Sequence, residues 1–100
     1  MELSAQGRRV VVTGGSEGLG LATARAYAGA GARVALLARR AEKLAEARDE
    51  IVSSTHAEVI AVQCDVSKSD EVLRAYQQIE AAFGGVDILI NNAGKSSFGP

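Results

Sequence analysis

Four short apolar runs, separated by longer stretches with helical periodicity, limit the folds open to this chain. The runs are Arg8 to Thr13, Arg33 to Ala38, Glu58 to Gln63 and Val86 to Asn91. They are built mostly from Val, Ile, Leu and Ala, without the in-and-out alternation of a strand that faces water on one side. Continuous apolar strands are typical of parallel sheets covered by helices on both faces. The sequence therefore predicts four parallel strands.

The stretches between these runs predict three helices. Their expected ranges are Gly18 to Ala30, Ala41 to Ser54, and a third segment that opens at Ser67 and runs to Phe83. Gly29 and Gly31 mark the end of the first, and Gly84-Gly85 follows the third. In the third segment, Ser67 is a candidate N-cap and Asp70 its reciprocal partner.

The order of these elements predicts a topology. Right-handed crossovers applied to a βαβαβαβ chain place the strands in the spatial order 3-2-1-4, with helices on both faces. This is a Rossmann-type, doubly wound α/β sheet. Its winding reverses between the first and fourth strands, and ligands of such sheets lie at that point, across the carboxyl ends of the strands. With no internal repeat or low-complexity linker in 100 residues, we expect a single domain.

A glycine-rich segment, Thr13-Gly14-Gly15-Ser16-Glu17-Gly18-Leu19-Gly20, joins the first strand to the first helix. Here Gly14 suits a tight turn, Gly18 a close backbone approach to phosphates, and Gly20 close packing of helix on sheet. Ser16 and the amide of Leu19 are candidate donors to a pyrophosphate or its ribose, because a helix N-terminus favours anions. The alternative is a tight connection that binds nothing.

Two further motifs occur after later strands, in the expected order. Asp65-Val66 follows the third strand, and Asn91-Asn92-Ala93-Gly94 follows the fourth. Together with the TGxxxGxG spacing of the glycine segment, they resemble the short-chain dehydrogenase/reductase family of nicotinamide-dependent oxidoreductases, over Arg8 to Pro100. The resemblance implies hydride transfer between a nicotinamide and a carbonyl or secondary alcohol substrate. A non-catalytic, dinucleotide-sensing protein of the same fold is the alternative.

The family's catalytic serine, tyrosine and lysine are expected beyond this region, so no catalytic residue is assigned. Neither Tyr27 nor Tyr76 has a lysine four residues later, and both fit helix faces. We therefore interpret residues 1–100 as the N-terminal, cofactor-binding part of one domain. The fourth strand would be an open edge, with one helix on one sheet face, and we expect the remainder of the enzyme or a complementary fragment to cover it. A homo-oligomer is expected for the full-length form.

The end of the second strand favours NADP(H) over NAD(H). An NAD enzyme places an acidic residue there for the ribose hydroxyls, whereas this chain has Arg39-Arg40. A guanidinium pairs bidentately with a 2′-phosphate that a carboxylate would repel. Glu17 departs from this pattern, since many NADP-dependent relatives have a basic residue there. The two arginines also fit a solvated helix start.

Asp65 resembles the family's aspartate that contacts the adenine amino group, and it also fits a turn that helps to cap the third helix. Asn91 is expected to be mainly structural. The residues predicted to bind the cofactor are Gly14, Ser16, Glu17, Gly18, Leu19, Gly20, Arg39, Arg40, Asp65, Val66, Asn92, Ala93 and Gly94.

Composition argues against several other classes of protein. With 11 Lys and Arg against 12 Asp and Glu, the net charge of −1 provides no field for nucleic acid. The single cysteine, Cys64, lies in an apolar run and is expected to be a buried, inert thiol. His56 has no nearby ligand cluster, so no metal site is expected. No apolar run approaches the roughly 18 to 20 residues of a membrane span, and Met1 to Gly7 lacks a signal-peptide core, so the expected location is cytoplasmic.

Overall fold

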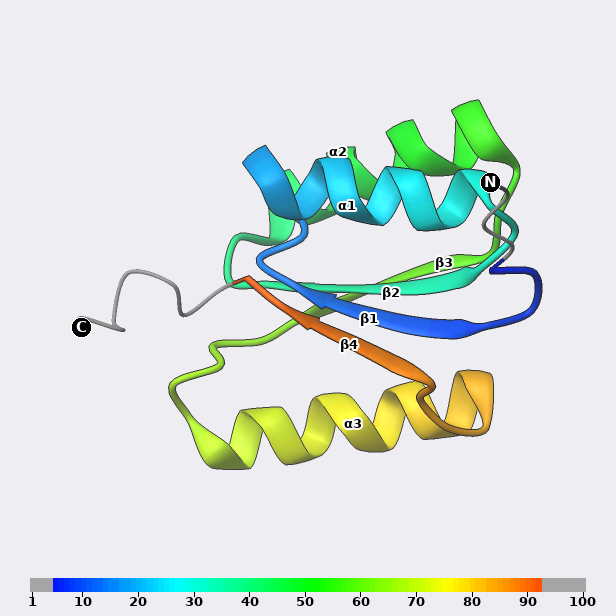
Figure 1. Cartoon of the computed structure of the whole chain (residues 1–100). Helices are drawn as coiled ribbons and strands as arrows, with labels where there is room; N and C mark the ends of the chain where they lie inside the picture. Colours follow the sequence, from blue (N-terminus) through cyan, green and yellow to red (C-terminus); the bar gives the residue numbers. More distant parts are fainter. Residues whose placement is uncertain (1–4, 93–100) are drawn as a thin grey trace, which may run out of the picture.

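Strands and helices alternate along the whole of the described chain (Figure 1). The computed structural model describes residues 5–92. Its elements are β1 (Arg9–Thr13), α1 (Gly18–Gly29), β2 (Arg33–Ala38), α2 (Ala41–Thr55), β3 (Val59–Gln63), α3 (Ser69–Phe83) and β4 (Ile88–Asn91). Each predicted element is present, with ends that differ by at most two residues.

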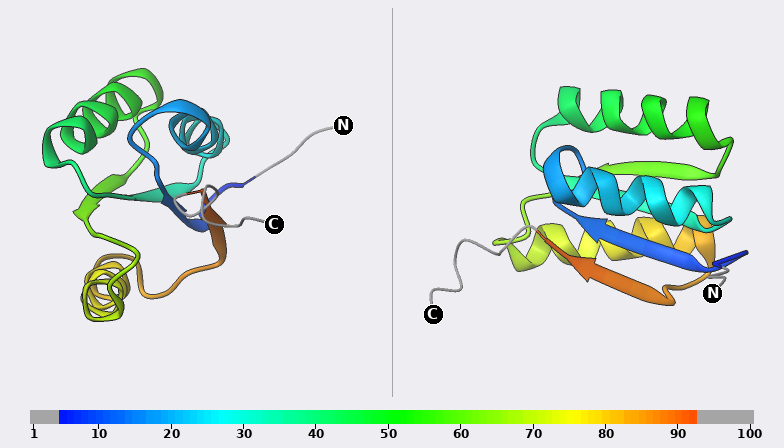
Figure 2. Two further views of the ribbon diagram at one scale, coloured as in Figure 1. Left: turned by 90° about the vertical axis from the view of Figure 1, so that its left-hand side faces the viewer. Right: turned by 45° about the horizontal axis from the view of Figure 1, so that its top comes forward.

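The four strands form one parallel sheet in the order β3-β2-β1-β4, which confirms the predicted topology. The central strand β1 aligns Val10 with Val34 of β2 on one side and with Ile88 of β4 on the other. Helices α1 and α2 lie on one face of the sheet and α3 lies on the opposite face (Figure 2). All strands therefore end at the same edge.

Burial on both faces explains why the strands lack alternation. Val10 and Val12 pack in the core beneath α1 and α2, whereas Val11 packs in the core beneath α3. All three valines are fully buried. Because burial of apolar area stabilises the folded state by about 25 cal/mol per Å², a strand that buries side chains on both faces contributes more than one with a face in water.

The predicted cap of α3 was wrong. The residue at the N-cap is Lys68, which makes no side-chain capping bond. The backbone N–H and the hydroxyl of Ser67 instead donate to Asp65 Oδ1, at 3.0 and 2.7 Å. The helix begins one residue later than this cap would require, so the Ser67 hydroxyl does not accept a helix N–H but donates to the Asp65 carboxylate, and the pair forms a local turn.

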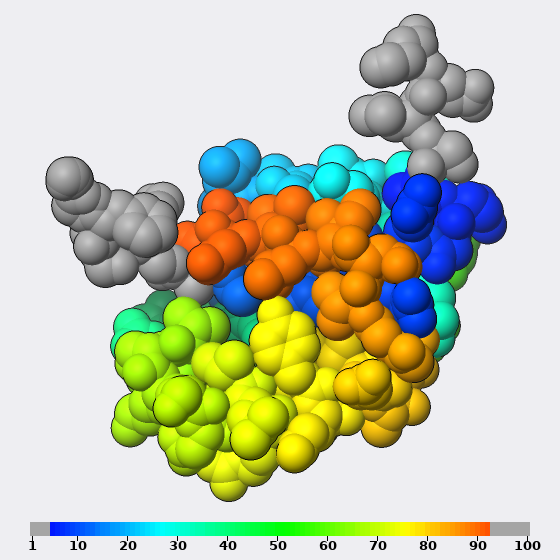
Figure 3. Space-filling model, turned by 60° about the horizontal axis from the view of Figure 1, so that its bottom comes forward, coloured from blue at the N-terminus to red at the C-terminus, as the bar shows by residue number. Residues whose placement is uncertain are grey.

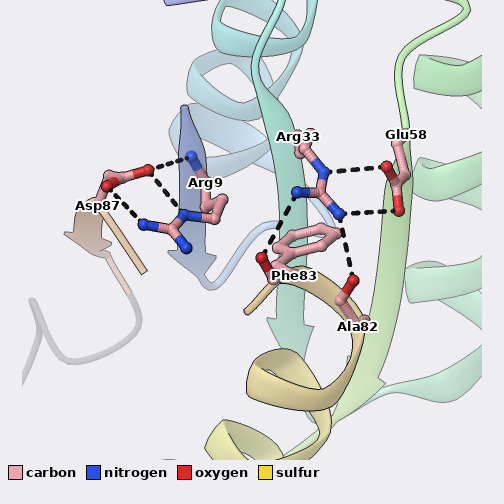
Figure 4. A network of polar contacts seen from close by, with 6 residues as sticks. All are labelled: Arg9, Arg33, Glu58, Ala82, Phe83 and Asp87. Atoms are coloured by element: carbon pink, nitrogen blue, oxygen red, sulfur yellow. Dashed lines mark hydrogen bonds and ion pairs between the residues drawn. The ribbon is translucent and has the colours of Figure 1, made fainter. Parts of the chain in front are cut away.

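Two arginines connect neighbouring elements at the amino edge of the sheet (Figure 4). Arg9 donates to Asp87 through its backbone N, Nε and Nη2, over 2.8 to 3.0 Å. These bonds hold the pKa of the Asp87 carboxyl well below its usual range. Arg33 Nε donates to Glu58, its Nη2 donates to the Ala82 carbonyl at 3.1 Å, and its guanidinium lies 4.6 Å from the Phe83 ring centre. The two guanidinium groups at this edge therefore use their donors for contacts within the chain.

The face that carries α3 is only partly covered. Helix α3 packs mainly against β2 and β3, while the Leu89 side chain of β4 is 50% exposed. In the space-filling view β4, in orange, lies open beside α3, in yellow and green (Figure 3). This agrees with the expected edge strand and single covering helix.

Candidate functional site

The glycine segment after β1 rests on the end of β2. The backbone N–H groups of Gly14 and Gly15 both donate to the Leu37 carbonyl, at 2.8 and 3.3 Å. Helix α1 passes so close to this segment that a Cβ built on Gly20 would lie 2.0 Å from the Gly14 carbonyl oxygen. Gly18 opens the helix with a φ of +60°, in the left-handed region that favours glycine. Gly14 has a φ of +67°, which suits the predicted turn, and the close packing of α1 predicted at Gly20 is present.

The N-terminus of α1 has no side-chain cap. Its N-cap residue, Glu17, makes no capping bond, and a helix of this kind leaves its first N–H groups without intrahelical acceptors. The side chain of Leu19 is 69% exposed, so it adds nothing to the core. Ser16 lies half-buried just before the helix. These positions leave the amides of the first turn available to an anion.

Arg39 and Arg40 follow β2 and are exposed. The amide Nε2 of Gln63, at the end of β3, donates to the Arg39 carbonyl at 2.9 Å and so fixes the backbone from which the guanidinium extends. That guanidinium makes no hydrogen bond with the described residues. Arg40 is the N-cap of α2 and accepts a backbone bond from Leu44.

Asp65, in the turn between β3 and α3, lies in an open pocket beside the end of β2. The pocket is lined by Arg39, Gln63, Asp65 and Glu71. Hydrogen bonds from Ser67 lower the pKa of the Asp65 carboxyl, and the charge of Arg39 lowers it further. The structure therefore brings the predicted phosphate-binding arginine and the predicted base-binding aspartate into one pocket.

Cys64 immediately precedes this turn and is almost completely buried. Burial raises the pKa of its thiol, as do the nearby charges of Glu71 and Asp65. The thiol is free and held in its neutral form, which confirms the expected buried cysteine.

The ends of β1 and β4 are joined through Thr13. Its hydroxyl donates to Asn91 Oδ1 and accepts the backbone N–H of Asn92, both at 2.9 Å. Asn91 therefore has the structural contact expected of it. The side-chain Nδ2 of Asn92 is buried and has no hydrogen-bond partner among residues 5–92. It lies 3.1 Å from the position that a Cβ on Gly20 would take, so this donor faces the glycine segment.

Four loops thus bring their predicted site residues to the carboxyl edge of the sheet, at the left in Figure 1. Val66 is half-buried and packs against the core beneath α3. The predicted residues Ala93 and Gly94 lie outside the described part of the chain. Tyr27 and Tyr76 pack against the two cores, as expected for helix-face residues.

Sequence reasoning missed two residues of the pocket, Gln63 and Glu71. Gln63 is the last residue of a strand, and a glutamine there has no distinctive pattern. Glu71 reaches back to accept the N–H of Asp65 at 2.8 Å. Its spacing from the N-cap is that of a capping box, but because the cap is Lys68 the sequence carries no such motif.

Within the part of the chain that the structure describes, no group of three or more His, Cys, Asp or Glu side chains could hold a metal ion. None of the described helices combines the length and apolar character needed to cross a bilayer.

Comparison with known proteins agrees with this geometry. The family model described as short chain dehydrogenase matches residues 8–100. The chain belongs to the short chain dehydrogenase family. The matched region includes the glycine segment, the pocket and Asn91-Asn92, so the carboxyl edge described above lies within the region that matches that family.

Individual members of the short chain dehydrogenase family resemble the chain closely. A short chain dehydrogenase of Pseudocercospora fijiensis is 43% identical over 95 residues, which are 95% of this chain and 30% of that protein. L-sorbose reductase from Gluconobacter frateurii, solved as a complex with NADPH and L-sorbose, is 37% identical with a TM-score of 0.91, over 94% of this chain and 36% of that one. A metagenomic short-chain oxidoreductase in complex with NADP is 44% identical with a TM-score of 0.83, over 89% and 40%.

The chain spans about a third of the length of the curated relatives it matches, between 30 and 36% for the first three. The similarity therefore concerns one part of the family's fold.

Proposed function

We propose that this chain is the N-terminal, nucleotide-binding part of an NADP(H)-dependent oxidoreductase that transfers a hydride between the nicotinamide and a carbonyl or secondary alcohol. One observation carries the proposal. The glycine segment rests on the Leu37 carbonyl, two residues before Arg39. The uncapped helix start and a guanidinium that makes no hydrogen bond with residues 5–92 therefore border the same edge. A pyrophosphate and a 2′-phosphate of one dinucleotide need this pair of neighbouring positive groups.

The residues of this edge suit such a dinucleotide. The amides near Gly18 and Leu19, with the Ser16 hydroxyl, would bind the pyrophosphate or its adjacent ribose. Gly14 and Gly20 keep side chains away from the path of the pyrophosphate. No side chain would fit at Gly20, because its Cβ would lie 2.0 Å from the Gly14 carbonyl oxygen. The buried Asn92 Nδ2 is a donor without a partner among the described residues, and a bound ribose oxygen would satisfy it.

The pocket would take the adenosine end. Arg39, with Arg40 beside it, would bind the 2′-phosphate, while the Asp65 carboxylate and the Val66 backbone would contact the adenine. Glu17 is exposed at the helix start and its charge would weaken, without cancelling, the preference for the phosphorylated cofactor. The complexes of L-sorbose reductase with NADPH and of the metagenomic oxidoreductase with NADP support this choice of cofactor. Ala93 and Gly94 complete the proposed set.

The bound cofactor supplies hydride chemistry, and the protein must supply a proton donor or acceptor to the substrate oxygen. Tyr27 and Tyr76 pack against the cores and are unsuited to this role. The serine, tyrosine and lysine of the family would therefore come from the remainder of the polypeptide, which would also cover β4. We further propose a cytoplasmic homo-oligomer that acts on a small carbonyl or alcohol substrate.

The test is titration of the full-length protein with NADPH and with NADH, followed by calorimetry and by thermal melting. Specific binding of NADPH, tighter than that of NADH, with a rise in melting temperature is expected. Absence of binding by both nucleotides would contradict the proposal. Tight binding without turnover of any carbonyl or alcohol in a broad panel would instead indicate a dinucleotide sensor.

A further inference from the structure

Glu71 makes a contact that the proposed cofactor roles do not use. It is the third residue of α3 and is half-buried at the rim of the pocket. Its Oε1 accepts the backbone N–H of Asp65 at 2.8 Å, across six residues. A bond to a charged acceptor of this length is among the stronger hydrogen bonds in proteins. The side chain therefore links the rigid start of α3 to the turn that precedes it.

Asp65 is held at three points. Its N–H donates to Glu71, its carbonyl accepts the N–H of Lys68 at 3.0 Å, and its Oδ1 accepts both donors of Ser67. Its Oδ2 receives no hydrogen bond from the described residues. One carboxylate oxygen is thus fixed by the turn, and the other remains available to a ligand in the pocket.

We propose that Glu71 is a positioning residue that holds Asp65 so that its carboxylate selects a base with an exocyclic amino group. The proposal rests on the proposed function, since it concerns the adenine end of the same cofactor. A carboxylate at neutral pH only accepts hydrogen bonds. An amino group donates to it, whereas a base with a carbonyl oxygen at that position presents a second acceptor and is disfavoured. Such a preference requires the carboxylate to stay in place.

The other side of the pocket is held independently of Glu71. Gln63 Nε2 fixes the Arg39 carbonyl, and the backbone N–H of Cys64 donates to the Ala38 carbonyl at 2.8 Å. Recognition of the base and recognition of the 2′-phosphate are therefore separable. Loss of the Glu71 contact should change the first and leave the second unaltered.

The test compares three nucleotides on the full-length protein by calorimetry: NADPH, NADH, and the analogue of NADPH in which hypoxanthine replaces adenine. The variants are Glu71→Asp, which keeps a negative charge at the helix start but shortens the reach by one methylene, and Glu71→Gln, which keeps the reach and an acceptor oxygen. Asp70→Ala is the matched control, because Asp70 is an acid of the same helical turn whose contact is with Arg74.

The parent should prefer NADPH over the hypoxanthine analogue by about tenfold, the range of one well-placed hydrogen bond to a charged group. In Glu71→Asp this preference should fall below about threefold, while Glu71→Gln and Asp70→Ala should retain most of it. The ratio of NADPH to NADH affinity should stay the same in all variants. A general loss of stability would not change the two ratios in this selective way.

Three results would overturn the inference. They are an unchanged base preference in Glu71→Asp, a loss in Glu71→Gln as large as in Glu71→Asp, and equal binding of both NADPH forms by the parent. The first two leave the proposed function unchanged. The third would also remove the proposed contact of Asp65 with the adenine, while binding of NADPH and the preference over NADH would stand. Failure of the parent to bind any of the three nucleotides would instead contradict the proposed function itself.

Discussion

The two edges of the sheet use arginine in opposite ways. At the amino edge, Arg9 of β1 and Arg33 of β2 are paired neighbours in the sheet. Arg9 forms an ion pair with Asp87, and Arg33 forms one with Glu58. At the carboxyl edge the Arg39 guanidinium makes no hydrogen bond with the described residues, and Asn92 has a buried donor without a partner among them.

The difference separates stability from recognition. A guanidinium whose carboxylate comes from the chain contributes to folding and has little left for a ligand. One that keeps its donors available has a weaker structural role and can bind an external anion. Substitutions at the amino edge should therefore change the free energy of unfolding, whereas substitution of Arg39 should change nucleotide affinity.

The largest effect is expected for Gly20→Ala, which breaks the carboxyl edge itself. The new methyl group would lie 2.0 Å from the Gly14 carbonyl oxygen, so α1 or the glycine segment must move. We expect a loss of about 3 kcal/mol or more in unfolding free energy, with loss of NADPH binding. Urea unfolding and calorimetry provide the measurements.

Gly29→Ala is the matched control, since a Cβ there meets nothing within 4 Å at the end of the same helix. It should be neutral or stabilising by a few tenths of a kcal/mol. Equal destabilisation by both substitutions would disprove the close-approach argument.

Arg39→Asp tests recognition without disturbing the fold. Removal of a charge-assisted bond worth about 1.5 to 3 kcal/mol should weaken NADPH binding roughly ten- to a hundredfold or more and move preference toward NADH. Lys43→Asp, an exposed charge reversal early in α2, serves as the control. Equal cofactor ratios in the parent and Arg39→Asp would refute the role of this guanidinium.

Arg33→Met tests the opposite edge. The variant keeps an apolar stem near Phe83 but loses the bonds to Glu58 and to the last carbonyls of α3. We expect about 1 to 2 kcal/mol of destabilisation in urea, with NADPH affinity unchanged. The surface pair Arg25–Glu50 offers a control, since Arg25→Met should cost less than about 0.5 kcal/mol. A large fall in affinity in Arg33→Met would break the separation between the edges.

The smallest effect is expected for Asp87→Asn, and it concerns how the free energy of unfolding depends on pH. Because Arg9 depresses the pKa of Asp87 below its ordinary value of 3.8, the Asp87 carboxylate contributes stability above that pH. The contribution falls as the pH drops from about 4 toward the folded pKa. Asp87→Asn should therefore be less stable than the parent at pH 7, and the difference should shrink in acid, as measured by urea unfolding across pH. A difference that is constant down to pH 2 would exclude this linkage. Asp70→Asn, at an exposed ion pair with Arg74, is the control at pH 7.

The fold could be predicted because its signals are local and repeated. The apolar run that contains Val10 to Val12, the helical periodicity of Ala41 to Ser54 and the handedness of crossovers were sufficient for the strand order. The family's glycine spacing likewise located the carboxyl edge. Side-chain contacts across long sequence separations were not predicted, since Arg9 and Asp87 meet only once β4 pairs with β1.

The path of the turn before α3 limited the prediction of the pocket. Ser67 has the residue type of a helix cap, yet the N-cap is Lys68, and the two donors of Ser67 bind the Asp65 carboxylate in the turn before the helix. Glu71 accepts a hydrogen bond from the N–H of Asp65, six residues earlier, and this separation does not correspond to the period of a helix or a strand. Such contacts depend on the exact path of a turn, and the sequence alone does not determine it.

The position of β1 also has a consequence for biosynthesis. Of the four described strands, β1 comes earliest in the sequence and lies inside the sheet, and its second neighbour, β4, pairs with it only after residues 88–91 have been made. Until then the nascent chain presents an unpaired, valine-rich strand edge, which is a hazard for aggregation. A pause of the ribosome before residues 88–91 have left the exit tunnel would lengthen that exposure, whereas a pause after they have emerged would not.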